Sequence, residues 1–283
     1  MISALNRLAS GTIELTITIP WQRVKIAYEK TLAASAKKTE IKGFRKGKAP
    51  QKLVEEKLGK PAVYEKVLQS LVPEVYLEAV KEQEVKPILN PQIKVISLKE
   101  GKAWQVKAIT CELPEIKLGD YQGEVKKALA AEKIWVPGKG AKNPAQTDEQ
   151  KLAKIFKALL EAVGVNIPSI LIEDEVNRML SRLVDQTGRL GLTIDQYLVS
   201  AGKTSDQLKE EYRRQAEKTL KLEFILSAIA NQEKITVTEA AIEKMIEVTP
   251  DEKTKKALDT PQQKIYLRQL LRKRQVIDGL MKL

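Results

Sequence analysis

The feature that most constrains the fold is a change of pattern along the chain. Residues 12–19, Thr-Ile-Glu-Leu-Thr-Ile-Thr-Ile, alternate apolar and polar side chains as a half-buried strand does. From about Leu152 onwards, apolar residues instead recur at helical spacing. Between these patterns, Pro137-Gly138-Lys139-Gly140 and Asn143-Pro144 break any regular element. The sequence therefore predicts two parts of different class joined by an irregular segment.

The first part predicts an antiparallel α+β layer. After the strand at 12–19, apolar spacing indicates a helix over 21–38, and further helices are expected after Pro50, ending at Gly59, and from Pro61 onwards. Pro73 is expected to kink or split the last of these helices. Two strands near 93–98 and 104–113 follow, joined by a turn at 99–102. Cys111, on the second strand, is expected to be a buried and inert thiol.

The second part predicts helices throughout. Their expected starts carry capping residues or prolines, at Asp148, at Ile167-Pro168-Ser169, and at Thr193, Thr204, 236–239 and Thr260. Most apolar side chains at helical spacing belong to a core, and a minority is expected to stay exposed where helices project. Six candidates for such a surface are Met179, Leu183, Tyr197, Leu198, Phe224 and Met245.

Composition excludes several classes of function. The chain of 283 residues contains no histidine and one cysteine, which removes the usual zinc ligand, the usual neutral-pH base and any intrachain disulfide. No apolar run is long enough to cross a bilayer, and the N-terminus has no signal-peptide pattern, so a cytoplasmic protein is expected. The net charge of +12 favours polyanionic or acidic partners. No cofactor or metal is predicted.

One stretch combines features that a simple connection does not need, namely Gly43-Phe44-Arg45-Lys46-Gly47-Lys48-Ala49-Pro50. The two glycines allow sharp turns on either side of an aromatic ring set among cations, and Lys42 adds a further charge. A solvated loop is the simpler interpretation, but an aromatic residue beside arginine is typical of an interface anchor. A phosphate-binding loop fails on spacing, because only three residues separate the glycines.

This stretch resembles the ribosome-docking signature of the trigger factor family of bacterial chaperones. The resemblance extends over about Ile13 to Tyr121 and resumes more weakly from Leu152. It implies an α+β ribosome-docking domain of antiparallel strands plus a helical hairpin (1–121), followed by an all-α domain with projecting arms (148–283) that binds substrate. It also implies that Phe44, Arg45 and Lys46 contact an exit-tunnel protein and ribosomal RNA, with Lys42, Gly43, Gly47 and Lys48 in support.

The chain departs from the family between these domains. The family carries a prolyl isomerase domain of the FK506-binding type there, and the segment 122–147 is too short to hold one. Only three phenylalanines, Phe44, Phe156 and Phe224, are present, too few and too scattered for an aromatic proline pocket there. We therefore expect a linker in that place, with one short strand or helix near 125–135, and no isomerase activity.

The functional expectation is an ATP-independent chaperone that docks near the polypeptide exit and shields unfolded or nascent chains in a helical cradle. Alternatives are a basic RNA-binding or ribosome-assembly protein, a residual isomerase, and a holdase that works off the ribosome. No membrane partner is expected, and a homodimer off the ribosome is left open.

Overall fold

We describe the protein from a computed structural model, in which residues 2–8, 11–38, 44, 50–130 and 147–283 are described. The chain divides into two compact units. Unit 1 is Met1–Leu113 with Pro168–Leu171, and unit 2 is Pro114–Ile167 with Ile172–Leu283. Unit 1 holds the antiparallel sheet and three helices, and unit 2 is helical, which is the α+β and all-α combination that the sequence predicts.

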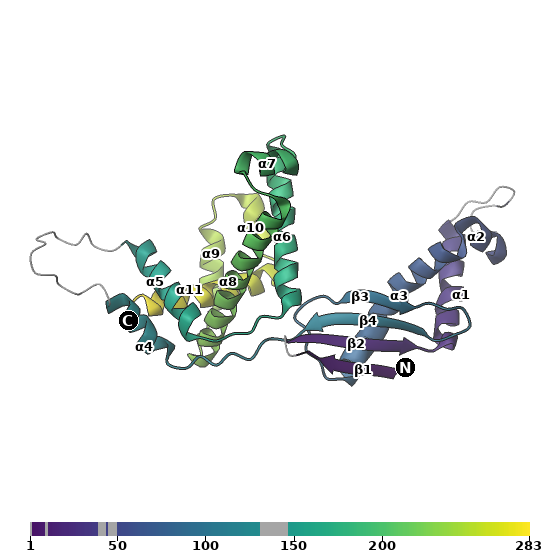
Figure 1. Ribbon diagram of the computed structural model, residues 1–283, viewed down its shortest axis with the longest axis horizontal. Helices are drawn as coiled ribbons and strands as arrows, with labels where there is room; N and C mark the ends of the chain where they lie inside the picture. The colour runs from purple at the N-terminus through teal and green to yellow at the C-terminus, as the bar shows by residue number, and fades with distance from the viewer. Residues whose placement is uncertain (1, 9–10, 39–43, 45–49, 131–146) are drawn as a thin grey trace, which may run out of the picture. The chain divides into compact units, whose positions relative to one another are not determined.

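The sheet of unit 1 has the strand order β1-β2-β4-β3, and every neighbouring pair is antiparallel (Figure 1). The strands are β1 (Ile2–Arg7), β2 (Thr12–Ile19), β3 (Gln92–Ser97) and β4 (Trp104–Cys111). In the central pair, Ile13 lies opposite Thr110 and Ile19 lies opposite Trp104. Cys111 is fully buried at the end of β4, and Gly101 adopts a positive φ of 76° in the turn before that strand.

Strand β1 was not predicted from the sequence. Its residues are exposed or half-exposed, so its side chains do not alternate between a core and solvent as those of β2 do. Pairing with β2 holds it in place, together with side-chain hydrogen bonds to Glu82 and Gln83. There the Ser3 hydroxyl donates a hydrogen bond to Glu82 Oε2 at 2.7 Å and accepts one from Gln83 Nε2 at 3.0 Å.

Helices α1 (Trp21–Lys38), α2 (Gln51–Leu58) and α3 (Lys60–Glu82) complete unit 1. One face of β2 and β4 packs with α1 and α3 into a core, because the alternating side chains of the strands meet the apolar stripes of the helices. Helix α3 runs unbroken through Pro73, so the expected split of that helix is wrong. Among the fully buried core side chains are Leu15, Ile17, Val24, Val63, Val67, Val75, Trp104 and Val106.

A chain of aromatic contacts joins α1, α3 and the sheet. The ring centroids of Tyr28 and Tyr64 are 5.5 Å apart, and those of Tyr64 and Trp104 are 5.2 Å apart in an edge-on arrangement. The Tyr28 hydroxyl donates a hydrogen bond to Glu55 Oε1 of α2 at 2.8 Å. Burial, together with this hydrogen bond, raises the pKa of Tyr28, so the hydroxyl stays protonated and remains a donor at neutral pH.

Gly59 forms the joint between α2 and α3. Its φ of 78° and ψ of 142° place it in a backbone region that residues with a Cβ rarely occupy. From there it caps α2, donating its N–H to the Glu55 carbonyl at 2.8 Å, and begins α3. The sequence prediction that the helix after Pro50 ends at Gly59 is confirmed.

Unit 2 consists of helices in its described part. These are α4 (Tyr121–Ala130), α5 (Asp148–Ala162), α6 (Ser169–Arg189), α7 (Ile194–Ala201), α8 (Ser205–Gln232), α9 (Glu239–Glu247), α10 (Glu252–Leu258) and α11 (Pro261–Leu280). Helices α4, α5, α8 and α11 form the base of the unit, where α5 and α8 bury Ile155, Leu159, Ile225 and Ile229. A smaller core joins α9, α10 and α11 through Ile242 and Leu267.

Capping residues fix where several helices of unit 2 begin. Thr193 and Thr204 accept N–H bonds from Gln196 and Gln207, whose side chains bond back, so α7 and α8 begin with capping boxes as expected. Helix α5 is capped in the same way by Thr147, and the expectation that Asp148 is its cap is wrong by one position. Helix α10 was not predicted, because its few apolar residues leave no periodic signal.

Part of the segment expected to be a linker is helical. Tyr121–Ala130 form α4, which packs against α5 and buries Val125 completely. The Tyr121 hydroxyl donates a hydrogen bond to Glu233 Oε1 at 2.7 Å, which ties the start of α4 to the end of α8. The rest of that segment, 131–146, lies outside the described residues.

Replacing Gly59 with alanine should lower the free energy of unfolding by about 1–3 kcal/mol, because the Cβ forces a strained backbone conformation. The space itself is open, since the nearest atom to an added Cβ is Pro61 Cδ at 3.8 Å. Gly188→Ala is the control, because Gly188 lies inside α6 with nothing within 4 Å, and alanine there should stabilise by about 0.5–1 kcal/mol. Urea unfolding followed by circular dichroism measures both changes. Equal effects of the two substitutions would contradict the strained backbone conformation at Gly59.

Candidate functional site

The candidate docking turn lies between α1 and α2. Helix α1 ends at Lys38 and α2 begins at Gln51, with Pro50 in an extended conformation (φ −58°, ψ 142°) at its N-cap. Phe44 is 43% exposed, so its ring is not enclosed by the core of unit 1. The other predicted docking residues, Lys42, Gly43, Arg45, Lys46, Gly47 and Lys48, lie outside the described residues.

The base of this turn is well anchored. Val54 of α2 is fully buried, and Glu55 on the next position accepts the hydrogen bond from Tyr28 of α1. Tyr28 in turn contacts Tyr64, whose ring meets Trp104 in the sheet. The two helices that carry the turn are therefore fixed to the core of unit 1 through neighbouring contacts, while Phe44 faces solvent.

The structure distinguishes among the six apolar residues predicted to line a substrate surface in unit 2. Leu183 is only 8% exposed, so its side chain belongs to the packed interior and the prediction for it is wrong. Helical periodicity alone cannot distinguish a packed leucine from an exposed one. The other five side chains are partly exposed, and Met245 also packs against the small core of α9 and α11. These five are Met179, Tyr197, Leu198, Phe224 and Met245.

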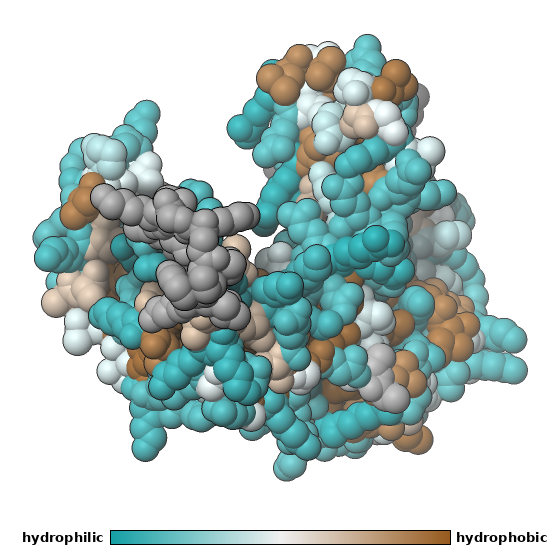
Figure 2. All heavy atoms as spheres, turned by 60° about the vertical axis from the view of Figure 1, so that its left-hand side comes forward, coloured by the Kyte–Doolittle hydropathy of each residue, from teal (hydrophilic) through white to brown (hydrophobic). Residues whose placement is uncertain are grey.

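A more exposed apolar surface lies at the end of the α6–α7 pair. Val199 is 82% exposed and Leu190 is 75% exposed, with Val184 and Leu192 also exposed nearby in sequence. Figure 2 shows apolar side chains gathered at this end of unit 2, above a largely hydrophilic column. We call Val184, Leu190, Leu192 and Val199 the arm-end patch; none of them was among the predicted residues.

Local structure explains why these side chains point outwards. The N–H groups of Leu190 and Leu192 both donate to the Thr187 carbonyl at 3.0 Å, which closes a tight turn after α6. Gly191 has a φ of 72° within it, and Thr193 then caps α7. A turn this short cannot fold its leucines back onto a core. The sequence signal was present, since two leucines flank a glycine at Leu190-Gly191-Leu192, two residues after Gly188.

Ionic contacts stiffen the arm that carries this patch. Arg178 bonds Asp174 one turn away on α6 at 2.7 Å, and Arg213 of α8 lies 3.6 Å from Glu173 of α6. Lys203, after α7, pairs with Glu211 of α8. The side chains of these pairs are 36–54% exposed, so each pair contributes little to stability, although together the pairs favour one arrangement of α6, α7 and α8.

Two classes of site receive no support from the described residues. Within the ranges that the structure describes, no three or more Cys, Asp or Glu side chains come together as a metal site would require. In the same ranges, no helix combines the length and apolar character needed to cross a membrane.

Family models match nearly the whole chain. A model described as bacterial trigger factor protein matches residues 1–134, and a model for the C-terminus of the same protein matches residues 140–282. A solved structure reported as "Promiscuous Substrate Recognition in Folding and Assembly Activities of the Trigger Factor Chaperone" has a TM-score of 0.67. The structural alignment covers 100% of this chain and 99% of that protein's chain. The sequence identity is 15%, so this similarity supports the fold alone.

Curated relatives agree with the family models. Trigger factor of Carboxydothermus hydrogenoformans is 25% identical over 373 aligned positions, covering 84% of this chain and 87% of the relative. Because the alignment is longer than the 283 residues of this chain, that relative contains residues without a counterpart here. Trigger factor of Lactiplantibacillus plantarum is 38% identical over 109 residues, which span 38% of this chain and 25% of the relative.

A third relative matches an intermediate length. Trigger factor of Natranaerobius thermophilus is 33% identical over 155 residues, or 54% of this chain and 34% of its own length. The shorter matches thus span a quarter to a third of the proteins concerned, whereas the family models together reach from residue 1 to residue 282. On this agreement, the chain belongs to the bacterial trigger factor family.

Proposed function

We propose that this protein is an ATP-independent chaperone that docks on the ribosome near the polypeptide exit and shields unfolded or nascent chains. The observation that carries the proposal is the exposure of Phe44 within a strongly basic segment whose flanking helices are anchored to a core. Aromatic and arginine side chains on a fixed support are the usual anchors of an interface. Family membership adds that the whole chain is built like other trigger factors.

In this proposal the two parts of the chain have different tasks. Residues 1–121 form the docking domain, with Phe44, Arg45 and Lys46 as contacts to an exit-tunnel protein and ribosomal RNA. Lys42, Gly43, Gly47 and Lys48 support that contact through charge and backbone conformation. Residues 148–283 bind the client, and residues 122–147 occupy the place of the isomerase domain. We place the protein in the cytoplasm, where nascent chains leave the ribosome.

The client-binding surface in this proposal centres on the arm-end patch, with Met179, Tyr197, Leu198, Phe224 and Met245 as partly exposed neighbours in the same unit. Each exposed apolar side chain offers only about 25 cal/mol per Å² of area covered, and the client must also be ordered on binding. Individual contacts are therefore weak and reversible. Weak contacts allow release without a nucleotide, which an ATP-independent chaperone requires.

A basic RNA-binding or ribosome-assembly protein is the second candidate, favoured by the net charge of +12. It predicts tight binding to free RNA and no effect on aggregating clients. An off-ribosome holdase, the third candidate, would bind an unfolded client and would not bind ribosomes. A low-salt pull-down scored separately for ribosomes, free RNA and an unfolded client separates these three possibilities.

We further propose that the chain lacks prolyl isomerase activity. The alignment with the Carboxydothermus relative is longer than this chain, and residues 122–147, of which 122–130 belong to α4, are too few for such a domain. Isomerisation of a proline-containing peptide should proceed at the uncatalysed rate, over tens to hundreds of seconds. Catalysis well above that rate would contradict the proposal.

Replacing Phe44, Arg45 and Lys46 together with alanine should weaken co-sedimentation with ribosomes by about 30-fold or more, as the loss of a hot spot worth about 2 kcal/mol does. Binding of the unchanged protein should also weaken as salt rises, because exposed cations are screened. The matched control replaces Lys25, Leu77 and Lys81, which are exposed on α1 and α3 outside the turn. An equal loss of ribosome binding in both variants, or no loss in the Phe44-Arg45-Lys46 variant, would contradict docking through the turn.

Replacing Leu190 and Val199 with serine should reduce suppression of aggregation of a denatured client by about twofold or more, since two of the most exposed apolar side chains are lost. Stability should change by no more than about 0.5 kcal/mol, because both residues are on the surface. Leu77→Ser with Leu113→Ser removes comparable exposed side chains from unit 1 as a control. Full activity of the arm-end variant would show that clients bind elsewhere.

A further inference from the structure

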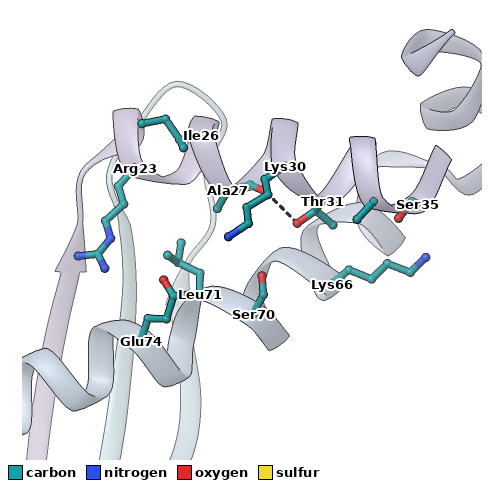
Figure 3. Close-up of a pocket in the computed structure, with 11 residues that line it drawn as sticks. Arg23, Ile26, Ala27, Lys30, Thr31, Ser35, Lys66, Ser70, Leu71 and Glu74 are labelled. Carbon is teal, nitrogen blue, oxygen red and sulfur yellow. Dashed lines mark hydrogen bonds between the residues drawn. The ribbon is translucent and has the colours of Figure 1, made fainter. Parts of the chain in front are cut away.

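A cavity of about 470 Å³ lies between α1 and α3 on unit 1, apart from the docking turn and the arm-end patch (Figure 3). The residues that α1 contributes recur every three or four positions from Arg23 to Ser35, so they share one face of the helix. The residues from α3 lie between Lys66 and Glu74. We call this cavity the α1–α3 groove.

Small side chains keep the groove open. Ala27 and Ala34 lie on the α1 side, where larger residues would fill the space, and the buried Leu71 of α3 contributes an apolar floor. Ile26 also lines the groove and is 67% exposed, so a ligand bound in the groove would cover part of its side chain. An apolar side chain of a ligand that covered this wall and floor would remove apolar surface from water, which favours binding.

Charge is distributed unevenly along the groove. At one end, both terminal nitrogens of Arg23 donate to the carboxylate of Glu78, each at 2.6 Å, and these bonds lower the pKa of Glu78. With Glu74 beside them, the positive charge at this end is already balanced. Lys30 and Lys66 are exposed, and neither has an ion-pair partner in the part of the chain that the structure describes.

Hydroxyl groups supply a third kind of contact. Thr31 Oγ1 donates to the Ala27 carbonyl at 2.7 Å, and Ser70 Oγ donates to the Val67 carbonyl at 3.0 Å. Because each hydroxyl proton is used within its own helix, the oxygen lone pairs remain available as acceptors. Acceptors beside an apolar floor suit the backbone N–H groups of a peptide, and the lysines suit its carboxylates.

We propose that the α1–α3 groove binds a short acidic peptide segment that carries a bulky apolar side chain. The apolar residue covers Ile26 and Leu71, and flanking carboxylates pair with Lys30 and Lys66. The volume lies within the range of about 300–1,000 Å³ that is typical of ligand sites, enough for a few side chains. Nucleic acid fits less well, because none of the described residues that line the groove is aromatic and able to stack on a base.

The probe for this site is a short fluorescein-labelled peptide in which glutamates flank two leucines, titrated against the full chain and followed by fluorescence anisotropy. Lys30→Glu with Lys66→Glu should weaken its binding by about tenfold or more, since attraction becomes repulsion. Ala34→Leu should weaken it similarly by filling the cavity, without any change of charge. Lys25→Glu, an exposed lysine of α1 outside the groove, should leave the affinity within about twofold.

Peptide controls separate the two parts of the recognition. Changing the leucines to serine, or the glutamates to lysine, should abolish binding to the unchanged protein. Equal binding of the serine peptide, or an equal loss in Lys25→Glu and the double reversal, would overturn the proposal in favour of general charge attraction. A short RNA that binds more tightly than the peptide and is lost in Ala34→Leu would assign the groove to nucleic acid instead.

This inference goes beyond the proposed function and can fail separately from it. Ala34→Leu places a good helix former at an exposed position, and an unchanged thermal melt confirms that it folds. The same variant should still co-sediment with ribosomes, since the docking turn is untouched. In Ala34→Leu, weakened peptide binding with intact ribosome binding supports both proposals. Intact peptide binding in this variant would overturn the groove proposal, and lost ribosome binding would count against docking through the turn alone.

Discussion

The structure of unit 1 depends on covering one face of a small antiparallel sheet. Strands β2 and β4 present a continuous row of buried side chains, and α1 and α3 must pack there to exclude water. The contacts from Tyr28 through Tyr64 to Trp104 fix the two helices against the sheet. Val24, Tyr28 and Leu32 hold α1 against this core, and Phe44, beyond the end of α1, is exposed. Helices held in this way give the proposed docking segment a fixed base, which reduces the cost of ordering on binding.

Unit 2 follows a different physical rule. Its helices are positioned by caps and by small local cores such as that of Ile242 and Leu267. In the described part of the chain, the side chains of the arm-end patch stay exposed. Apolar side chains there remain in water, which is costly for folding but useful for binding other chains. Separating a charged anchor from an apolar binding surface lets the two act on different partners. The proposed chaperone function rests on that division of chemistry.

Sequence patterns predicted the elements whose burial is regular and missed those whose burial is not. Strand β2 and helix α1 were placed at their observed bounds because their apolar periods are clean. Strand β1 and helix α10 were missed, since one is held mainly by its neighbour and the other by the cap of Asp251. Leu183 and Leu190 show the limit for the site: both are leucines of the α6 region, and only the turn geometry decides which is buried. The α1–α3 groove left no signal, because alanines rather than a motif create it.

Hydrogen–deuterium exchange of the full chain, with and without ribosomes, tests the division of tasks most directly. The account predicts slower exchange on ribosome binding in 39–50 and in the adjoining ends of α1 and α2, with no change at 184–199. Adding an unfolded client should then slow exchange at 184–199. Protection of 184–199 by empty ribosomes, with 39–50 unaffected, would contradict the account.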